Sequence, residues 1–168
     1  NGMVIPNYSS PDHWEKFNVL GVSQYGQMTA GSFMYIGPQG IVHGTTITVM
    51  NAARKVATGN HKEGLLFVTS GLGGMSGAQP KAANIAGVVS ITAEVNPKAA
   101  NKRFDQCWVD YITDKVDMAI DLAIEKQASG QPFSIAFLGN IVDLWERLAD
   151  RNIKVDLGSD QTSLHNPW

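Results

Sequence analysis

A glycine-rich stretch carries the clearest chemical signal in this chain. Residues 71–79 read GLGGMSGAQ and directly follow a short apolar run at residues 65–68. A strand that ends in a glycine-rich turn and continues into a helix presents bare backbone N–H groups and a positive helix end, which indicates a phosphate site. The dinucleotide fingerprint G-x-G-x-x-G is met at its first two glycines, but Ser76 occupies the sixth place and Gly77 lies one residue later. A tight turn that binds nothing is the alternative interpretation.

A carboxylate at the end of the next apolar run points to the same kind of ligand. Residues 88–93 read VVSITA and lead directly into Glu94. An acidic residue about 20 residues beyond the glycines, at the tip of the second strand, is placed to accept hydrogen bonds from an adenosine ribose. It would also repel a 2′-phosphate, which favours NAD over NADP. The alternative is that Glu94 is only a solvated strand end.

The other candidates for catalysis or metal binding are weaker. The four histidines, His13, His43, His61 and His165, include no pair with metal-ligand spacing, and none clusters with the single cysteine. Cys107 fits a small buried thiol better than a nucleophile. His165 ends the polar run DQTSLH, and we leave open whether it is a site residue or an exposed loop imidazole. The residues therefore indicate a cofactor site without naming a catalytic group.

Helices and strands that alternate along the chain must position these residues. The predicted strands lie at residues 65–69, 88–94, 133–138 and 154–157, and the predicted helices at residues 41–56, 77–87, 114–126 and 141–150, with a helix or loop from Pro97. This alternation predicts an α/β, Rossmann-like fold with a mostly parallel sheet and helices on both faces. Ligands of such sheets gather where the strands end. Polar segments should therefore converge on one edge, namely residues 70–77, Glu94, residues 139–140 and residues 159–165.

The domain organisation is expected to have two parts. Residues 1–40 have weak periodicity and many turn formers, so we expect an irregular segment shaped by the core of a longer protein. Residues 41–168 should form the Rossmann-like domain, incomplete at its C-terminal end. The start at Asn1 without a methionine and the end at Trp168 also suggest a piece of a longer chain.

The bulk composition describes a weakly charged globular protein. The 168 residues are 43% hydrophobic and 17% charged, which suits one domain with a substantial core. The net charge of −2 gives no reason to expect nucleic acid or an anionic membrane as a partner. No apolar stretch approaches the length of a membrane span, and no signal peptide is visible. A single cysteine cannot form an internal disulfide, which agrees with a cytoplasmic location.

Several long strings resemble the central NAD-binding region of the urocanase family. They read YGQMTAGS at residues 25–32, YIGPQGIVHGT at 35–45, GLGGMSGAQP at 71–80 and DQTSLH at 160–165. Together they extend over nearly the whole chain and are far more specific than a glycine fingerprint. The resemblance implies a cytoplasmic, homodimeric enzyme that adds water to urocanate to give imidazolone propionate in histidine degradation. It further implies that tightly held NAD+ acts as an electrophile and not as a redox carrier.

The resemblance also assigns cofactor contacts by position. It implies that the glycine-rich turn wraps the pyrophosphate, that the acidic strand end holds the adenosine ribose, and that the other residues contact the rest of the dinucleotide. The implied NAD-binding residues are Gln27, Gly73, Gly74, Met75, Ser76, Glu94, Asn140, Ile141, Gln161, Thr162, Ser163, Leu164 and His165. One departure concerns Ala99, where the family often has an arginine. Lys98, Lys102 or Arg103 are the nearby cations that could replace it.

Two other functions are compatible with the glycines and Glu94 when they are taken alone. One is an NAD-dependent oxidoreductase domain that transfers hydride, and the other is a non-catalytic nucleotide-sensing module. The reactive cysteine of the urocanase family lies downstream of the matched stretch, and Cys107 does not correspond to it. We therefore expect this chain to be the cofactor half of an enzyme and to have no activity by itself.

Overall fold

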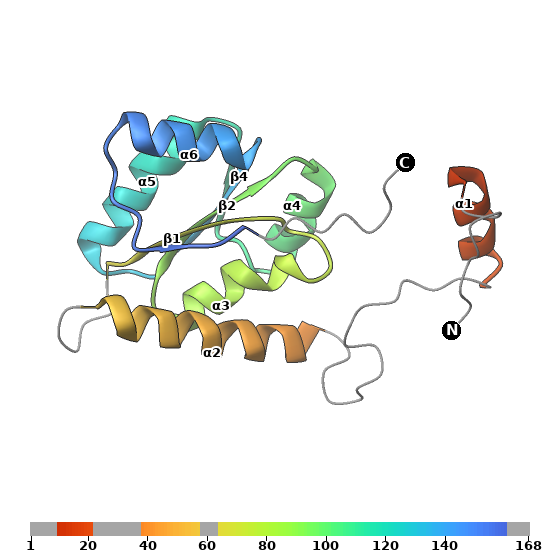
Figure 1. The fold of residues 1–168 in the computed structure, drawn as a ribbon, viewed down its shortest axis with the longest axis horizontal. Coiled ribbons are helices and arrows are strands. Elements are labelled where there is room, and N and C mark those ends of the chain that lie inside the picture. The colour runs from red at the N-terminus through yellow and green to blue at the C-terminus, as the bar shows by residue number, and fades with distance from the viewer. Residues whose placement is uncertain (1–9, 22–37, 58–63, 161–168) are drawn as a thin grey trace. The chain divides into compact units, whose positions relative to one another are not determined.

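The chain consists of two units in the computed structural model. Internal contacts separate Asn1–Ile36 from Gly37–Trp168. The structure describes residues 10–21, 38–57 and 64–160 (Figure 1). None of the helices in these ranges combines the length and the apolar character that crossing a membrane requires.

The described part of the first unit is a short helix. Helix α1 spans Pro11–Val19, and the Ser10 hydroxyl accepts a hydrogen bond of 3.4 Å from the backbone N–H of His13. This helix lies inside the segment 1–40, for which the sequence predicted irregular structure. The difference arises because serine and proline, counted there as turn formers, are also the preferred residues at the start of a helix.

A parallel sheet forms the centre of the second unit. Its strand order is β3-β4-β2-β1-β5, and every pair of neighbouring strands is parallel. The strands are β1 (Leu66–Ser70), β2 (Val89–Glu94), β3 (Tyr111–Thr113), β4 (Ser134–Leu138) and β5 (Leu157–Gly158). The helices are α2 (Pro38–Val56), η2 (Ser76–Ala78), α3 (Gln79–Ala86), α4 (Pro97–Asp105), α5 (Val116–Ser129) and α6 (Ile141–Asp150). The predicted Rossmann-like α/β fold is confirmed.

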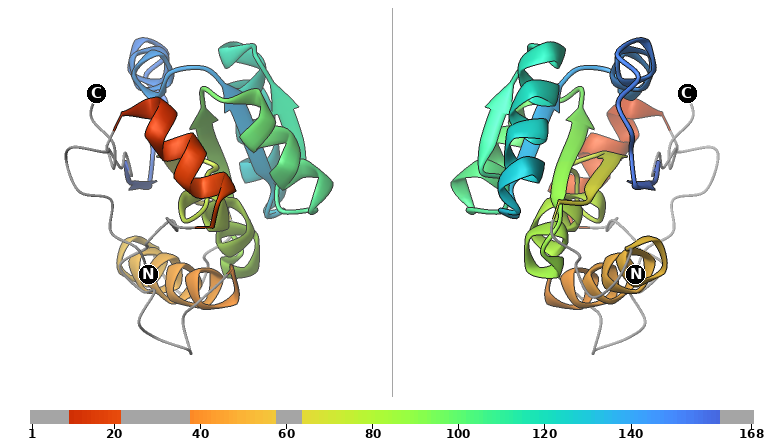
Figure 2. Two further views of the ribbon diagram at one scale, coloured as in Figure 1. Left: turned by 90° about the vertical axis from the view of Figure 1, so that its right-hand side faces the viewer. Right: turned by 90° about the vertical axis from the view of Figure 1, so that its left-hand side faces the viewer.

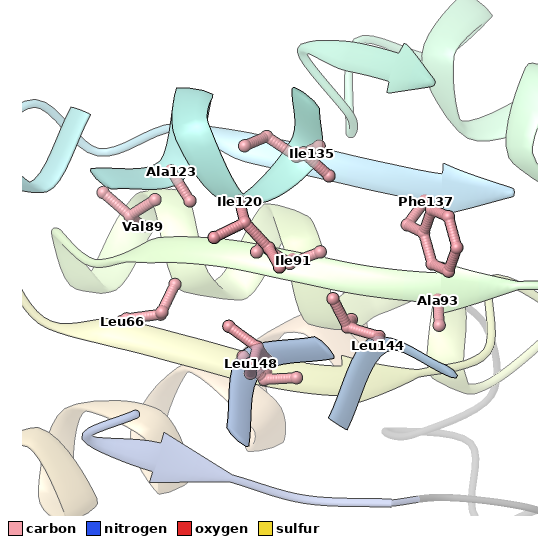
Figure 3. Packing of buried hydrophobic residues seen from close by; sticks show 12 residues of the cluster. Leu66, Val89, Ile91, Ala93, Ile120, Ala123, Ile135, Phe137, Leu144 and Leu148 are labelled. Carbon is pink, nitrogen blue, oxygen red and sulfur yellow. The ribbon is translucent and has the colours of Figure 1, made fainter. Parts of the chain in front are cut away.

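Helices α5 and α6 cover one face of the sheet (Figure 3). Successive strand residues point to opposite faces, so one set of alternate side chains in each central strand turns to these helices. Ile120 of α5 and Leu144 and Leu148 of α6 are at most 1% exposed and complete this layer. The strand residues packed against them are Leu66, Val68, Val89, Ile91, Ala93, Ile135 and Phe137.

The opposite face carries α3 and α4, with α2 packed against α3 (Figures 1 and 2). Here the alternate residues of β2 are Ser90 and Thr92, both fully buried. The facing helices present small side chains as well, such as Ala83 in α3 and Ala100 in α4. Small residues on both sides allow close packing, which brings the start of α3 against the ends of the strands.

Most predicted elements agree with the structure, and the differences have local causes. The predicted helix 141–150 coincides with α6, whereas the predicted helix 77–87 begins with the short turn η2 and continues as α3. Strand β3 is absent from the prediction, because three residues between Asp110 and Asp114 are too few to show a period.

The last strand is shorter than the predicted span of residues 154–157. The Asp156 carboxylate accepts a hydrogen bond of 3.0 Å from the backbone N–H of Leu66, and the Asp156 N–H donates to the Leu66 carbonyl at 3.1 Å. The side-chain oxygen thus takes the place of a strand carbonyl, and β5 begins only at Leu157. Lys154 forms an ion pair of 2.8 Å with the same carboxylate.

Candidate functional site

The carboxyl ends of four strands meet at one edge of the sheet. In the parallel register Ser70 lies beside Ala93, and Glu94 lies beside Leu138. The loops that follow are tied to the neighbouring strands by backbone hydrogen bonds from Gly71 to Ala93 (2.8 Å), from Gly139 to Glu94 (3.1 Å) and from Ser159 to Val68 (3.0 Å). The structure therefore brings together the glycine-rich turn, Glu94, residues 139–140 and residues 159–160, as the strand pattern predicted.

The glycine-rich turn leaves a row of backbone amides without acceptors. Gly71 has a φ of +88°, a conformation that favours glycine, and it turns the chain away from β1. Further along, the N–H of Gly77 donates to the Gly73 carbonyl at 3.1 Å. Within the part of the chain that the structure describes, the N–H groups of residues 73–76 donate to no protein acceptor. Consecutive free amides before a helix are a suitable site for an anion.

Glu94 is part of the framework of this turn. Its Oε2 accepts a hydrogen bond of 2.6 Å from the Leu72 N–H, and its Oε1 accepts one of 2.9 Å from the Asn96 N–H. The half-buried carboxylate thus joins the glycine-rich turn to the start of α4, so the reading as a solvated strand end is wrong. A carboxylate offers about four acceptor positions, so these two bonds leave capacity for a ligand hydroxyl.

A buried arginine lies behind the turn. Of the three cations named as replacements for the arginine missing at Ala99, Lys98 and Lys102 are exposed, whereas Arg103 is 6% exposed. The Arg103 guanidinium donates to the carbonyl of Leu72 at 3.1 Å and to that of Gly73 at 2.5 Å. Burial lowers the pKa of Arg103 from its usual value. The sequence could name this residue only as one of three candidates, because the contact joins positions about 30 residues apart.

A buried polar network connects β1, α3 and β5. The Thr69 hydroxyl donates to Gln79 Oε1 at 2.6 Å and lies 2.8 Å from the Ser159 hydroxyl. Gln79 Nε2 returns a hydrogen bond of 3.0 Å to the Ser70 carbonyl, and the Ser70 hydroxyl donates to Asp160. Gln79 is 5% exposed, and sequence reasoning did not identify it. The network ties Ser159 and Asp160, which follow β5, to β1 and to the start of α3.

The remaining sequence-predicted residues divide into two groups. Asn140 is exposed and caps α6, because its Oδ1 accepts a hydrogen bond of 3.0 Å from the Val142 N–H. Ile141 is half-buried and packs against the core under α5 and α6. The predicted contacts at Gln27 and at residues 161–165, including His165, lie outside the described residues.

Two minor expectations concern reactive side chains. The interpretation of Cys107 as a buried thiol is wrong, because the residue is exposed in the turn after α4 and has a φ of +55°. Its N–H donates to the Phe104 carbonyl at 2.8 Å, which closes that turn. Across the described ranges, His, Cys, Asp and Glu side chains form no group of three or more that could hold a metal ion.

Comparison with known proteins identifies related sequences. Residues 37–168 match the family model described as the urocanase Rossmann-like domain, and residues 1–34 match the urocanase N-terminal domain. The chain is 55% identical over 169 residues to a probable urocanate hydratase of Caenorhabditis elegans, 56% over 170 residues to one of Dictyostelium discoideum, and 54% over 173 residues to urocanate hydratase of Mus musculus. These matches cover 100% of this chain and 25%, 25% and 26% of the relatives, so the chain spans about a quarter of their length. The chain therefore belongs to the urocanase family.

Proposed function

We propose that this chain provides the NAD+-binding site of a urocanate hydratase. The observation that carries the proposal is the row of unpaired amides at residues 73–76, with the Arg103 guanidinium behind it and Glu94 beside it. Free amides and a buried cation suit the two negative charges of a pyrophosphate. A Rossmann-like sheet with these groups at the carboxyl edge is typical of dinucleotide binding.

The proposed contacts follow the order of the strands along this edge. Gly73, Gly74, Met75 and Ser76 bind the pyrophosphate, and Glu94 accepts hydrogen bonds from the adenosine ribose. Asn140 and Ile141 begin α6 just after β4, whose last residue, Leu138, pairs with Glu94, and they contact the adenosine part. Because Asn140 Oδ1 is used in capping α6, its side-chain NH2 group is the part left to donate to a ligand. Gln27, Gln161, Thr162, Ser163, Leu164 and His165 complete the proposed site.

The proposed reaction is the addition of water to urocanate, after the function that the names of the relatives state. Bound NAD+ supplies an electrophilic ring in this chemistry. The residues of this chain hold and orient the cofactor, and the substrate site and catalytic groups belong to other parts of a cytoplasmic, homodimeric protein. Residues 1–40 are proposed to pack on the core of that protein.

Binding and activity can be tested separately. We expect calorimetry of the intact protein, after removal of any bound nucleotide, to show binding of NAD+ and much weaker binding of NADP+. Failure to bind any dinucleotide would refute the proposal. We also expect the 168-residue chain by itself not to consume urocanate, since reactants and catalytic groups must be held together for the reaction. Loss of the urocanate ultraviolet absorbance with this chain alone would contradict that expectation.

The same preparation distinguishes the two other functions. An oxidoreductase domain would produce the NADH absorbance band when NAD+ and a small alcohol or hydroxy acid are added. A nucleotide-sensing module would bind and release NAD+ rapidly and would leave urocanate unchanged in the intact protein. Urocanate hydration without net NADH formation supports the proposed function against both.

A further inference from the structure

The Arg103 side chain has an unusual set of partners for a buried cation. Besides the Leu72 and Gly73 carbonyls, it donates to Gln106 Oε1 at 2.7 Å and lies 5.2 Å from the centre of the Trp108 ring. Among the described residues, no aspartate or glutamate forms an ion pair with it. Burial of a charge is costly unless it is compensated, and arginine does not lose its proton in proteins. The side chain therefore keeps a positive charge, and the partners that the described ranges provide for it are neutral groups.

The place of Gly77 is explained by the same guanidinium. A Cβ atom at Gly77 would lie 2.1 Å from Arg103 Nε and 2.7 Å from Cζ. Any side chain at this position would displace the guanidinium from the turn. The glycine that lies one residue beyond the usual fingerprint thus provides the space in which Arg103 packs.

Arg103 also determines which way two peptide groups of the turn face. In a trans peptide the carbonyl of one residue and the N–H of the next point in opposite directions. Since the Leu72 and Gly73 carbonyls point to Arg103, the N–H groups of Gly73 and Gly74 point away from it. These are two of the amides that have no acceptor among the described residues. The guanidinium thus lies on one side of the turn, and the free donors lie on the other.

We propose that Arg103 is the positioning residue of the pyrophosphate site: it orients the Gly73 and Gly74 amides toward the ligand and places behind them a positive charge that has no carboxylate partner among the described residues. This inference rests on the proposed NAD+ site, and it assigns a role in cofactor binding to a residue that does not contact the cofactor. The role requires both the fork of the guanidinium, which reaches two carbonyls, and its charge. Lysine at the same position would provide the charge and only a single donor group.

The first test compares Arg103→Lys and Arg103→Met with Arg54→Met, which removes an exposed arginine of α2. We expect NAD+ affinity in the intact protein to fall about ten- to a hundredfold with Arg103→Met and less with Arg103→Lys. Arg54→Met should leave it unchanged. ADP-ribose should follow NAD+, whereas adenosine, which has no phosphate, should bind all the proteins equally. Equal NAD+ affinity of wild type and Arg103→Met, or an equal loss for adenosine, would overturn the inference.

A double-mutant cycle tests the contact with Gly77. Gly77→Ala should weaken NAD+ binding in the wild-type background, because the new methyl group displaces the guanidinium. In the Arg103→Ala background the same change should have little further effect. If the loss of affinity in the double variant equals the sum of the losses in the two single variants, Gly77 and Arg103 act independently, which would contradict the proposal. If the Arg103→Ala variants fold poorly, Arg103→Lys, which keeps the charge, replaces Arg103→Ala in the cycle.

A measurement without ligand separates this inference from the proposed function. The hydrogen-bonded amides of Gly71, Leu72 and Gly77 should exchange faster in Arg103→Met than in wild type, because the turn loses two carbonyl anchors. Unchanged exchange would overturn the positioning role even if NAD+ binds. Faster exchange in a protein that binds no dinucleotide would support the role of Arg103 in the turn and refute the NAD+ site.

Discussion

Arginines hold two regions of this protein together in opposite ways. At the glycine-rich turn, Arg103 is buried and bonds to backbone carbonyls. On the other face of the sheet, Arg147 and Arg151 are partly exposed and bond to carboxylates of α5, with distances of 2.8 Å from Arg147 to Asp117 and 2.6 Å from Arg151 to Asp121. Exposed ion pairs contribute little to stability, whereas a buried guanidinium with fixed partners determines the conformation of the backbone around it.

The layers around these arginines differ in the same way. The layer under α5 and α6 is apolar, and ion pairs at the protein surface join α5 to α6 and the residue that follows it. The edge that carries the glycine-rich turn has buried polar groups and free amides. The comparison suggests that the first region mainly stabilises the fold and the second mainly binds the ligand. Variants in the two regions should therefore separate stability from affinity.

The largest effect on stability is expected in the apolar layer. Leu148 of α6 is 1% exposed and packs against the core of the sheet. Leu148→Ala should lower the free energy of unfolding by about 2–5 kcal/mol, because it removes buried apolar surface and leaves a cavity. Denaturant unfolding measures this loss, with Val142→Ala on the exposed side of α6 as the control. Weaker NAD+ binding by fully folded Leu148→Ala would contradict the separation of the two regions.

A smaller effect is expected at Glu94, and it concerns the affinity for NAD+ rather than the stability of the fold. Glu94→Ala should weaken NAD+ binding by about 1.5–3 kcal/mol, or roughly ten- to a hundredfold, and should relax the exclusion of NADP+. Because Glu94 also accepts bonds from the Leu72 and Asn96 N–H groups, exchange of those amides should become faster as well. Calorimetry with both dinucleotides measures the first effect, and Glu146→Ala, at an exposed glutamate of α6, is the control. If NAD+ affinity is unchanged and NADP+ is still excluded, Glu94 has only its structural role within the turn.

The smallest effect is expected at the surface ion pairs, and it depends on pH. The hydrogen bond from Arg147, together with the charges of Arg147 and Arg151, lowers the pKa of Asp117 below its usual value, against a smaller opposing effect of desolvation. Since the pKa is lower in the folded state, the stabilisation is complete above the unfolded-state value of about 3.9 and is lost as the pH falls through the lowered pKa. Asp117→Asn should thus lower the melting temperature slightly at neutral pH and not at strongly acidic pH. A pH-independent difference, or an equal change in the control Asp105→Asn, would contradict this origin.

The pattern of apolar runs predicted the fold well because each strand and helix is indicated by residues close together in the sequence. Short strands alternating with amphipathic helices allow few arrangements other than a covered parallel sheet, and α6 has the predicted bounds. Where the prediction failed, a contact between distant residues decided the outcome. The bond from the Leu66 N–H to the Asp156 carboxylate shortens β5, and its partners lie 90 residues apart.

The sequence by itself determined the class of fold, the glycine-rich turn and the acidic strand end, because each is a pattern within a short stretch of chain. It also carried the strings that resemble the urocanase family. Only the tertiary structure decided that Arg103 lies against the Gly73 carbonyl, that Gly77 makes room for it, and that Glu94 holds the Leu72 amide. These contacts join residues 22 to 30 positions apart. No local pattern specifies them, because they form only when the sheet brings the ends of β1 and β2 together.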